Sequence, residues 1–172
     1  MQSIKLKNKY IDSTGIVHNE TLLSDYIDKF LEFPILRIKP SNNVSITANT
    51  YKTLPFDEII ENTASDYLEQ NQEKTHIIAK KKCTIVIAGA FSTSSIANNG
   101  AQFGITYNHD GNLNSGVKLR SLFYAARQNS QVVVPATYIN LNTGDYIAIP
   151  MYFPDAGGIT VNSYINVAVV NK

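Results

Sequence analysis

The sequence predicts an all-β protein, a sandwich of antiparallel strands preceded by a short segment of different character. From residue 44 onward, short runs rich in β-branched and aromatic residues follow one another at regular intervals. Clusters of Asn, Asp, Gly and Pro separate these runs. No helical periodicity interleaves them, which excludes an alternating α/β fold.

Residues 1–40 form the segment that differs. One or two short strands are expected before a turn at 12–15, because apolar residues stand there among charges: Ile4, Leu6, Tyr10 and Ile11. A helix is expected at about 20–32, where apolar residues recur at spacings of three and four after Asn19, a suitable N-cap. Pro34 ends this helix. We therefore expect an attachment or trimerisation segment with one helix.

The apolar stripe of this helix must be buried, since an isolated helix of this length is marginal in water. Two arrangements fit equally well. The helix packs on its own domain, or three copies pack around an axis through Leu23, Tyr26 and Phe30. The stripe covers fewer than two heptads, which is too short to decide between the two.

Residues 44–172 form the second predicted domain, after a linker at 40–43. The stretch 56–72 is acidic and polar, and it holds an early strand or a long loop. The other strands are expected at 44–48, 75–79, 84–91, 101–107, 117–125, 131–138, 146–152 and 163–170.

Two of these strands are apolar on both faces, unlike a strand with one face in water. The run 84–91 carries one apolar set at Ile85, Ile87 and Phe91, and a second set at Val86, Ala88 and Ala90. Since large exposed apolar patches are uncommon on monomers, we expect a neighbouring subunit to cover the second face. Loops of the same chain are the alternative cover. The expected interface residues of the two strands are Val86, Ala88, Tyr164, Ala168 and Val170.

Composition excludes several classes of partner. The 172 residues carry a formal net charge of +1, so no nucleic-acid partner is expected. No apolar run reaches the ~20 residues that span a membrane, and the first residues lack the apolar core of a signal peptide. We therefore expect synthesis in a reducing cytoplasm without membrane insertion. The single cysteine, Cys83, is expected to be a buried structural thiol.

No motif indicates catalysis, a metal or a cofactor. The histidines, His18, His76 and His109, lie in no zinc-binding motif, and there is no phosphate-binding loop. Residues 108–114 alternate oxygen-bearing side chains as calcium loops do, but they contain one carboxylate and lack the closing Glu. A hairpin turn explains them better. We expect a non-enzymatic protein with no catalytic residue, no metal site and no cofactor.

Tyrosine and asparagine suit the recognition of a saccharide or a protein. Ten tyrosines accompany no tryptophan, and asparagine is frequent in the turns. Such residues offer stacking faces and hydrogen-bonding groups, although they also suit the core and turns of a sandwich. The candidate ligand-binding residues lie in three loops: Asn98, Asn99, Tyr107, His109, Asp110, Asn112 and Asp155.

Residues 141–149, Leu-Asn-Thr-Gly-Asp-Tyr-Ile-Ala-Ile, resemble the Leu-x-x-Gly-Asp-x-Val motif of the C1q/TNF-like jelly-roll family. The Gly-Asp pair makes a tight turn, and Ile147 and Ile149 point into the core. Residues 163–169 resemble the closing strand of that family, which lies near a three-fold axis. The resemblance implies a jelly-roll head over about 44–171 and a homotrimer.

The resemblance has one clear departure. Residues 75–91 correspond to a strand, turn and strand that carry Ala-Pro and Gly-x-Tyr in the family. This chain has Ala79-Lys80 and Lys82-Cys83 at those places.

Residues 4–19 resemble the opening of structural proteins from bacteriophages of Gram-positive bacteria. This resemblance implies a virion protein of a tail fibre or baseplate, a homotrimer attached through its N-terminal segment to other virion proteins. The exposed head then binds a host cell-surface saccharide or receptor. A structural capsid decoration or head fibre is the first alternative. A secreted C1q/TNF-like ligand is less supported, and a glycan-degrading enzyme is the least supported.

Overall fold

The computed structural model describes residues 9–11, 17–19, 33–94, 100–109, 119–125 and 131–171. The chain divides into two compact units, residues 1–33 and 34–172. In the first unit, β1 (Lys9–Ile11) and β2 (Val17–Asn19) pair as an antiparallel hairpin. The helix predicted at about 20–32 lies outside the described residues.

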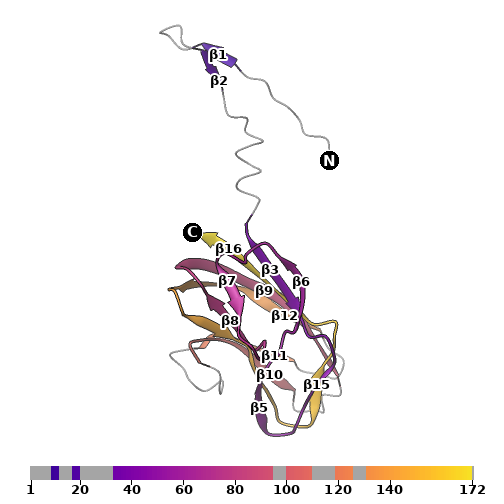
Figure 1. Cartoon of the computed structure of the whole chain (residues 1–172). Helices are drawn as coiled ribbons and strands as arrows, with labels where there is room; N and C mark the ends of the chain where they lie inside the picture. The colour runs from indigo at the N-terminus through magenta and orange to yellow at the C-terminus, as the bar shows by residue number, and fades with distance from the viewer. Residues whose placement is uncertain are drawn as a thin grey trace. The chain divides into compact units, whose positions relative to one another are not determined.

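The second unit, here called the head, contains two seven-stranded antiparallel sheets (Figure 1). Sheet 1 has the order β5 (Thr50–Thr53), β14 (Pro150–Phe153), β10 (Ala101–Tyr107), β13 (Tyr146–Ala148), β8 (His76–Ala79) and β7 (Leu68–Gln70). The seventh strand, β11 (Leu119–Ala125), pairs with β10.

Sheet 2 has the order β4 (Val44–Ile46), β15 (Gly157–Ile159), β9 (Cys83–Ser94), β16 (Tyr164–Asn171), β3 (Ile35–Lys39) and β6 (Glu58–Asn62). Its seventh strand, β12 (Gln131–Leu141), pairs with β9. The long strand β9 therefore lies between β12 and β16 over most of its length.

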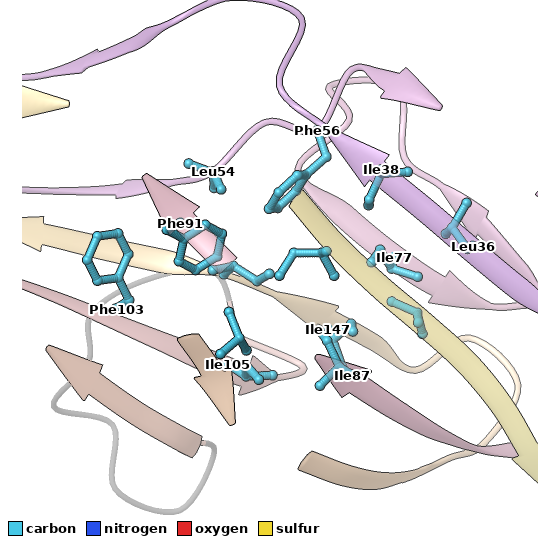
Figure 2. Packing of buried hydrophobic residues seen from close by; sticks show 14 of the residues in the cluster. Leu36, Ile38, Leu54, Phe56, Ile77, Ile87, Phe91, Phe103, Ile105 and Ile147 are labelled. Carbon is cyan, nitrogen blue, oxygen red and sulfur yellow. The ribbon is translucent and has the colours of Figure 1, made fainter. Parts of the chain in front are cut away.

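The core lies between the two sheets and is filled by alternate residues of their strands (Figure 2). Phe91 of sheet 2 stacks on Phe103 of sheet 1 with ring centroids 5.1 Å apart. Ile85 and Ile87 of the same strand as Phe91 are also fully buried. Two antiparallel sheets that enclose an apolar core between them confirm the predicted sandwich.

The head begins one strand earlier than the predicted boundary at residues 40–43. β3 pairs with β16, the last strand of the chain, and its Leu36 and Ile38 are buried in the core. The sequence of this five-residue strand, which directly follows Pro34, does not indicate that it pairs with a strand at the far end of the chain. The structure thus places Ile35–Lys39 in the head and not in the preceding segment.

Most strands predicted for the head are present, and four short ones are additional besides β3. The ambiguous stretch 56–72 contains two strands, β6 and β7. β5 and β15 were not predicted, because three or four residues are too few for a periodic pattern. Gly144 has φ 86° in the predicted tight turn, and Ile147 and Ile149 are buried, as the motif at 141–149 indicated.

Candidate functional site

The outward surface of sheet 2 carries apolar side chains in register across its strands. Tyr138 of β12 pairs with Val86 of β9, which pairs with Ala168 of β16, which pairs with Ile35 of β3. Residues that pair directly lie on the same side of a sheet, so these four form one row. Tyr138 is 72% exposed at the edge of this row.

A second apolar row crosses the same surface further along the strands. Val133 of β12 pairs with Ala90 of β9, which pairs with Tyr164 of β16. Val133 is 73% exposed and Tyr164 is 38% exposed, whereas Ala90 between them is only 5% exposed. The two rows together place large apolar side chains on a surface that ordinary β-strands give to polar residues.

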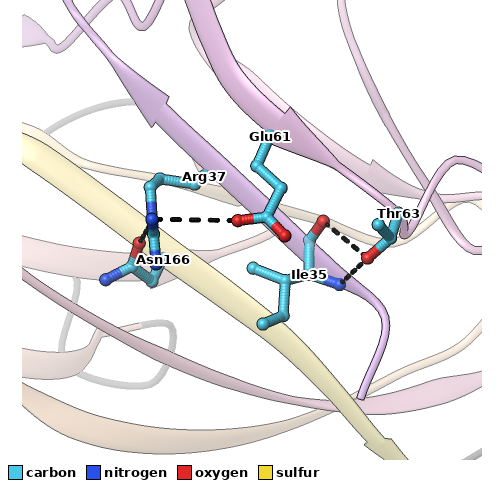
Figure 3. Close-up of polar contacts among 5 residues, drawn as sticks. All are labelled: Ile35, Arg37, Glu61, Thr63 and Asn166. Carbon is cyan, nitrogen blue, oxygen red and sulfur yellow. Dashed lines mark hydrogen bonds and ion pairs between the residues drawn. The ribbon is translucent and has the colours of Figure 1, made fainter. Parts of the chain in front are cut away.

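A polar row lies between the two apolar rows, and part of it is drawn in Figure 3. Nε of Arg37 donates a hydrogen bond of 2.7 Å to Oδ1 of Asn166, and Arg37 lies 3.7 Å from a carboxylate oxygen of Glu61. Asn166 pairs in turn with Ala88. The guanidinium charge is therefore matched by Glu61, and the row adds no uncompensated charge to the surface.

A hollow of about 510 Å³ opens on the β3 side of this surface. Its wall includes Arg37, Lys39, Ile60, Tyr164 and Asn166. Lys39 forms an ion pair of 3.1 Å with Glu58, so the second cation of the hollow is also compensated. The surface therefore has protruding apolar side chains at the β12 edge and a neutral hollow near the opposite edge. We call this surface, with both rows and the hollow, the sheet 2 face.

The interface residues that the sequence suggested in strands β9 and β16 all lie on the sheet 2 face. Val86, Ala88, Ala168 and Val170 are half-buried, and Tyr164 is exposed. Tyr138 and Val133, the most exposed large apolar residues described, were not singled out from the sequence. Their strand contains three consecutive valines, 132–134, and a bulge between Val134 and Thr137. The valine run was a sign of a second apolar surface, whereas only the position of the strand at a sheet edge reveals Tyr138. The suggested helix residues Leu23, Tyr26 and Phe30 lie outside the described residues.

The suggested ligand residues do not form one site among the residues described. Tyr107 lies at one end of β10, whereas Asp155 follows β14 near the other end of β10. The hydroxyl of Tyr107 donates to Asp145, and the carbonyl oxygen of His109 accepts a hydrogen bond from Thr106. Four further suggested residues lie outside the described ranges: Asn98, Asn99, Asp110 and Asn112.

The described part of the chain contains no cluster of three or more His, Cys, Asp or Glu side chains that could hold a metal ion. Cys83 is buried, and desolvation raises the pKa of its thiol. Among the described residues there is also no helix long and apolar enough to cross a membrane. The sheet 2 face is therefore the candidate functional site.

Solved structures share this architecture at low sequence identity. Murine APRIL has a TM-score of 0.60 and 10% identity, with 80% of this chain and 99% of APRIL covered. Eiger TNF from S. frugiperda has a TM-score of 0.57 and 9% identity, covering 80% of this chain and 92% of Eiger. The globular domain of zebrafish complement 1qA has a TM-score of 0.55 and 12% identity, covering 81% and 98%.

These similarities define the class of fold. The head is a jelly roll of the type found in TNF and complement 1q domains, as the motif at residues 141–149 suggested. No protein-family model matches the chain, and no curated protein matches it.

Proposed function

We propose that this chain is a non-enzymatic homotrimer whose jelly-roll heads bind a partner, and that it forms part of a bacteriophage fibre or baseplate. The sheet 2 face is the single observation that carries the proposal. Its two apolar rows and its compensated charges suit burial against protein better than exposure to water. The occupant that we assign to it is a second copy of this chain.

The arrangement of the face favours a ring. Tyr138 and Val133 protrude at the β12 edge, and the hollow beside Tyr164 lies across the sheet from them. A protrusion that fits a hollow elsewhere on an identical copy makes a heterologous contact, and such contacts close into a ring when the rotation allows. The small side chains of Ala88 and Ala168 let the neighbouring copy approach closely. Burying each large apolar side chain contributes about 1.5–3 kcal/mol.

The ion pairs near the hollow lower the cost of burying its charges in such a contact. A charge buried without a partner is costly, whereas Arg37 and Lys39 already have Glu61 and Glu58 beside them. A neighbouring copy therefore needs only to supply apolar and neutral polar groups.

Trimerisation gives the head its mode of action. Three equivalent ligand sites on one rigid body raise the effective affinity of a weak contact without any new interaction. Many trimers on a particle multiply this effect. We assign the ligand to the host cell surface, as a saccharide or receptor.

The first unit supplies the attachment in this proposal. Its described part is the β1–β2 hairpin, inside the stretch that resembles phage structural proteins. We assign residues 1–33 to contacts with other virion proteins, with the head held outward. A head without a host ligand, as in a capsid decoration, leaves this attachment and the trimer unchanged.

An extracellular C1q/TNF-like ligand is the second candidate, favoured by the similarity of fold to murine APRIL and Eiger TNF. Immunogold labelling separates the two. Antibodies against the chain are expected to label virus particles from the producing culture. Recovery of the chain only as free protein in the medium contradicts the phage assignment and supports the ligand.

Light scattering on the full chain at micromolar concentration tests the trimer. The expected mass is three times the chain mass of 19.0 kDa. Lys52→Ala, an exposed change on sheet 1, is the matched control and should leave the mass unchanged. A monomeric wild-type chain would overturn the proposed assembly and its avidity.

A further inference from the structure

Two tyrosines lie side by side on the outward surface of sheet 1. Tyr51 of β5 and Tyr152 of β14 are register partners, and their ring centroids are 4.8 Å apart at an interplanar angle of 36°. Tyr51 is 39% exposed and Tyr152 is half-buried. The inward neighbours Met151 and Phe153 are fully buried, so the alternation of β14 directs Tyr152 outward.

The rings of Tyr51 and Tyr152, here called the platform, are held in place by the turn before β5. The hydroxyl of Tyr152 is 3.0 Å from Oδ1 of Asn49, to which it donates a hydrogen bond. Asn49 has φ 55° and its backbone N–H donates to the carbonyl of Phe153 at 2.7 Å. Both the ring and its polar anchor are therefore fixed by the backbone, which lowers the entropy lost when a ligand binds.

The surroundings of the platform are polar and almost uncharged. Gln102 of β10 pairs with Tyr152 and is half-buried, and its amide forms no hydrogen bond within the described part of the chain. The strands β5, β14 and β10 contain a single charged residue, Lys52. The amino group of Lys52 donates to the carbonyl of Ser45 at 3.2 Å.

From this juxtaposition we propose that Tyr51, Tyr152 and Gln102 form a binding site for a neutral saccharide. The apolar CH face of a pyranose ring packs on an aromatic surface, and an amide donates to and accepts from its hydroxyl groups. An anionic ligand would require uncompensated cations, and Lys52 is the one cation on these three strands.

The position of the site suits a head held at its other end. β3 begins beside the C-terminal end of β16, where the N–H of Val169 donates to the carbonyl of Pro34 at 2.9 Å. β5 lies at the opposite end of the head (Figure 1). The site is also on sheet 1, whereas the proposed subunit contact is on sheet 2, so trimerisation leaves it open. The inference rests on the proposed partner-binding role of the head.

Binding of the full chain to an array of neutral hexose and N-acetylhexosamine oligosaccharides tests the site, with poly(glycerol phosphate) as an anionic comparison. We expect the wild-type protein to bind at least one neutral glycan. Tyr51→Ala should weaken that binding about tenfold, and Gln102→Ala about threefold, because each removes a group that contacts the sugar. Tyr51→Phe keeps the aromatic face and should stay within about twofold of the wild type.

Light scattering and thermal melting of the same variants separate the site from the assembly. All three variants should remain trimeric with melting temperatures close to that of the wild type. Unchanged glycan affinity in both Tyr51→Ala and Gln102→Ala would overturn the site while leaving the proposed trimer intact. Binding to the anionic polymer alone, or to no glycan of the array, would overturn the ligand class. A monomeric wild type that still binds through Tyr51 would instead refute the assembly.

Discussion

The hydroxyl of Tyr107 donates a hydrogen bond of 2.7 Å to Oδ2 of Asp145, joining the end of β10 to the turn that precedes β13. Nδ2 of Asn108 donates to Oδ1 of the same carboxylate at 2.8 Å, and the N–H of Asn142 donates to Oδ2 at 2.6 Å. Asp145 thus closes its own turn and fastens that turn to a neighbouring strand. Tyr107, a ligand candidate from the sequence, has this structural contact.

Tyr107→Phe removes one hydrogen bond to a carboxylate and leaves the aromatic ring. We expect a loss of about 1 kcal/mol in the free energy of unfolding, because this site is only partly shielded from water. Urea denaturation of both proteins measures it. Phe at this position should not change the light-scattering mass, since the residue lies away from the sheet 2 face. A Tyr107→Phe protein as stable as the wild type would show that the contact contributes nothing.

The hydrogen bonds to Asp145 also lead us to expect that acid destabilises the fold. Desolvation by itself would raise the pKa of the Asp145 carboxyl. The hydrogen bonds from Asn108, Tyr107 and Asn142 outweigh this effect and lower the pKa below its usual 3.8. A carboxyl whose folded pKa is lowered stabilises the fold fully above its unfolded pKa, and this contribution is lost as the pH falls through the folded pKa. The free energy of unfolding should therefore decrease below about pH 4. Asp145→Asn should be less stable than the wild type at pH 7 and should lose less on acidification.

Two glycines should respond differently to alanine. Gly144 has φ 86° and nothing within 4 Å of an added Cβ, so Gly144→Ala costs about 1 kcal/mol of backbone strain alone. At Gly89 an added Cβ would collide with the carbonyl oxygen of Tyr164 and would lie 3.1 Å from Cα of Ile165. Gly89→Ala should therefore separate β9 from β16 and lower the melting temperature far more. Equal melting temperatures for the two variants would contradict this packing.

Substitutions on the sheet 2 face should dissociate the proposed trimer without unfolding the head. Tyr138→Glu places a charge at a position that is 72% exposed in the single chain, so its cost appears only at the contact between copies. Ala168→Asp should act in the same way. We expect monomers by light scattering, with the β-sheet circular dichroism retained. A trimer that persists in both variants would locate the contact elsewhere.

Cys83 should resist alkylation in the native protein. The thiol is buried, and desolvation raises its pKa, so little thiolate is available at neutral pH. Iodoacetamide at pH 8 should modify it slowly in buffer and rapidly in denaturant, as mass spectrometry would show. Rapid native modification would show that the start of β9 opens readily.

The sequence determined the sandwich and one of its apolar surfaces. Runs of β-branched residues and turn residues are local properties, so they located β9, β10, β12 and β16 and the turn at Gly144 and Asp145. The second apolar set of β9 was visible as well, since a side chain on a strand faces one of only two directions. These features are fixed by neighbours in the chain.

The tertiary structure decided which distant residues meet. Pairing of β3 with β16 placed Ile35–Lys39 in the head, and the edge position of β12 exposed Tyr138. Tyr51 and Tyr152 lie far apart in the sequence, and they adjoin only because β5 pairs with β14. Such pairings are set by long-range packing of the two sheets, which a local pattern does not encode.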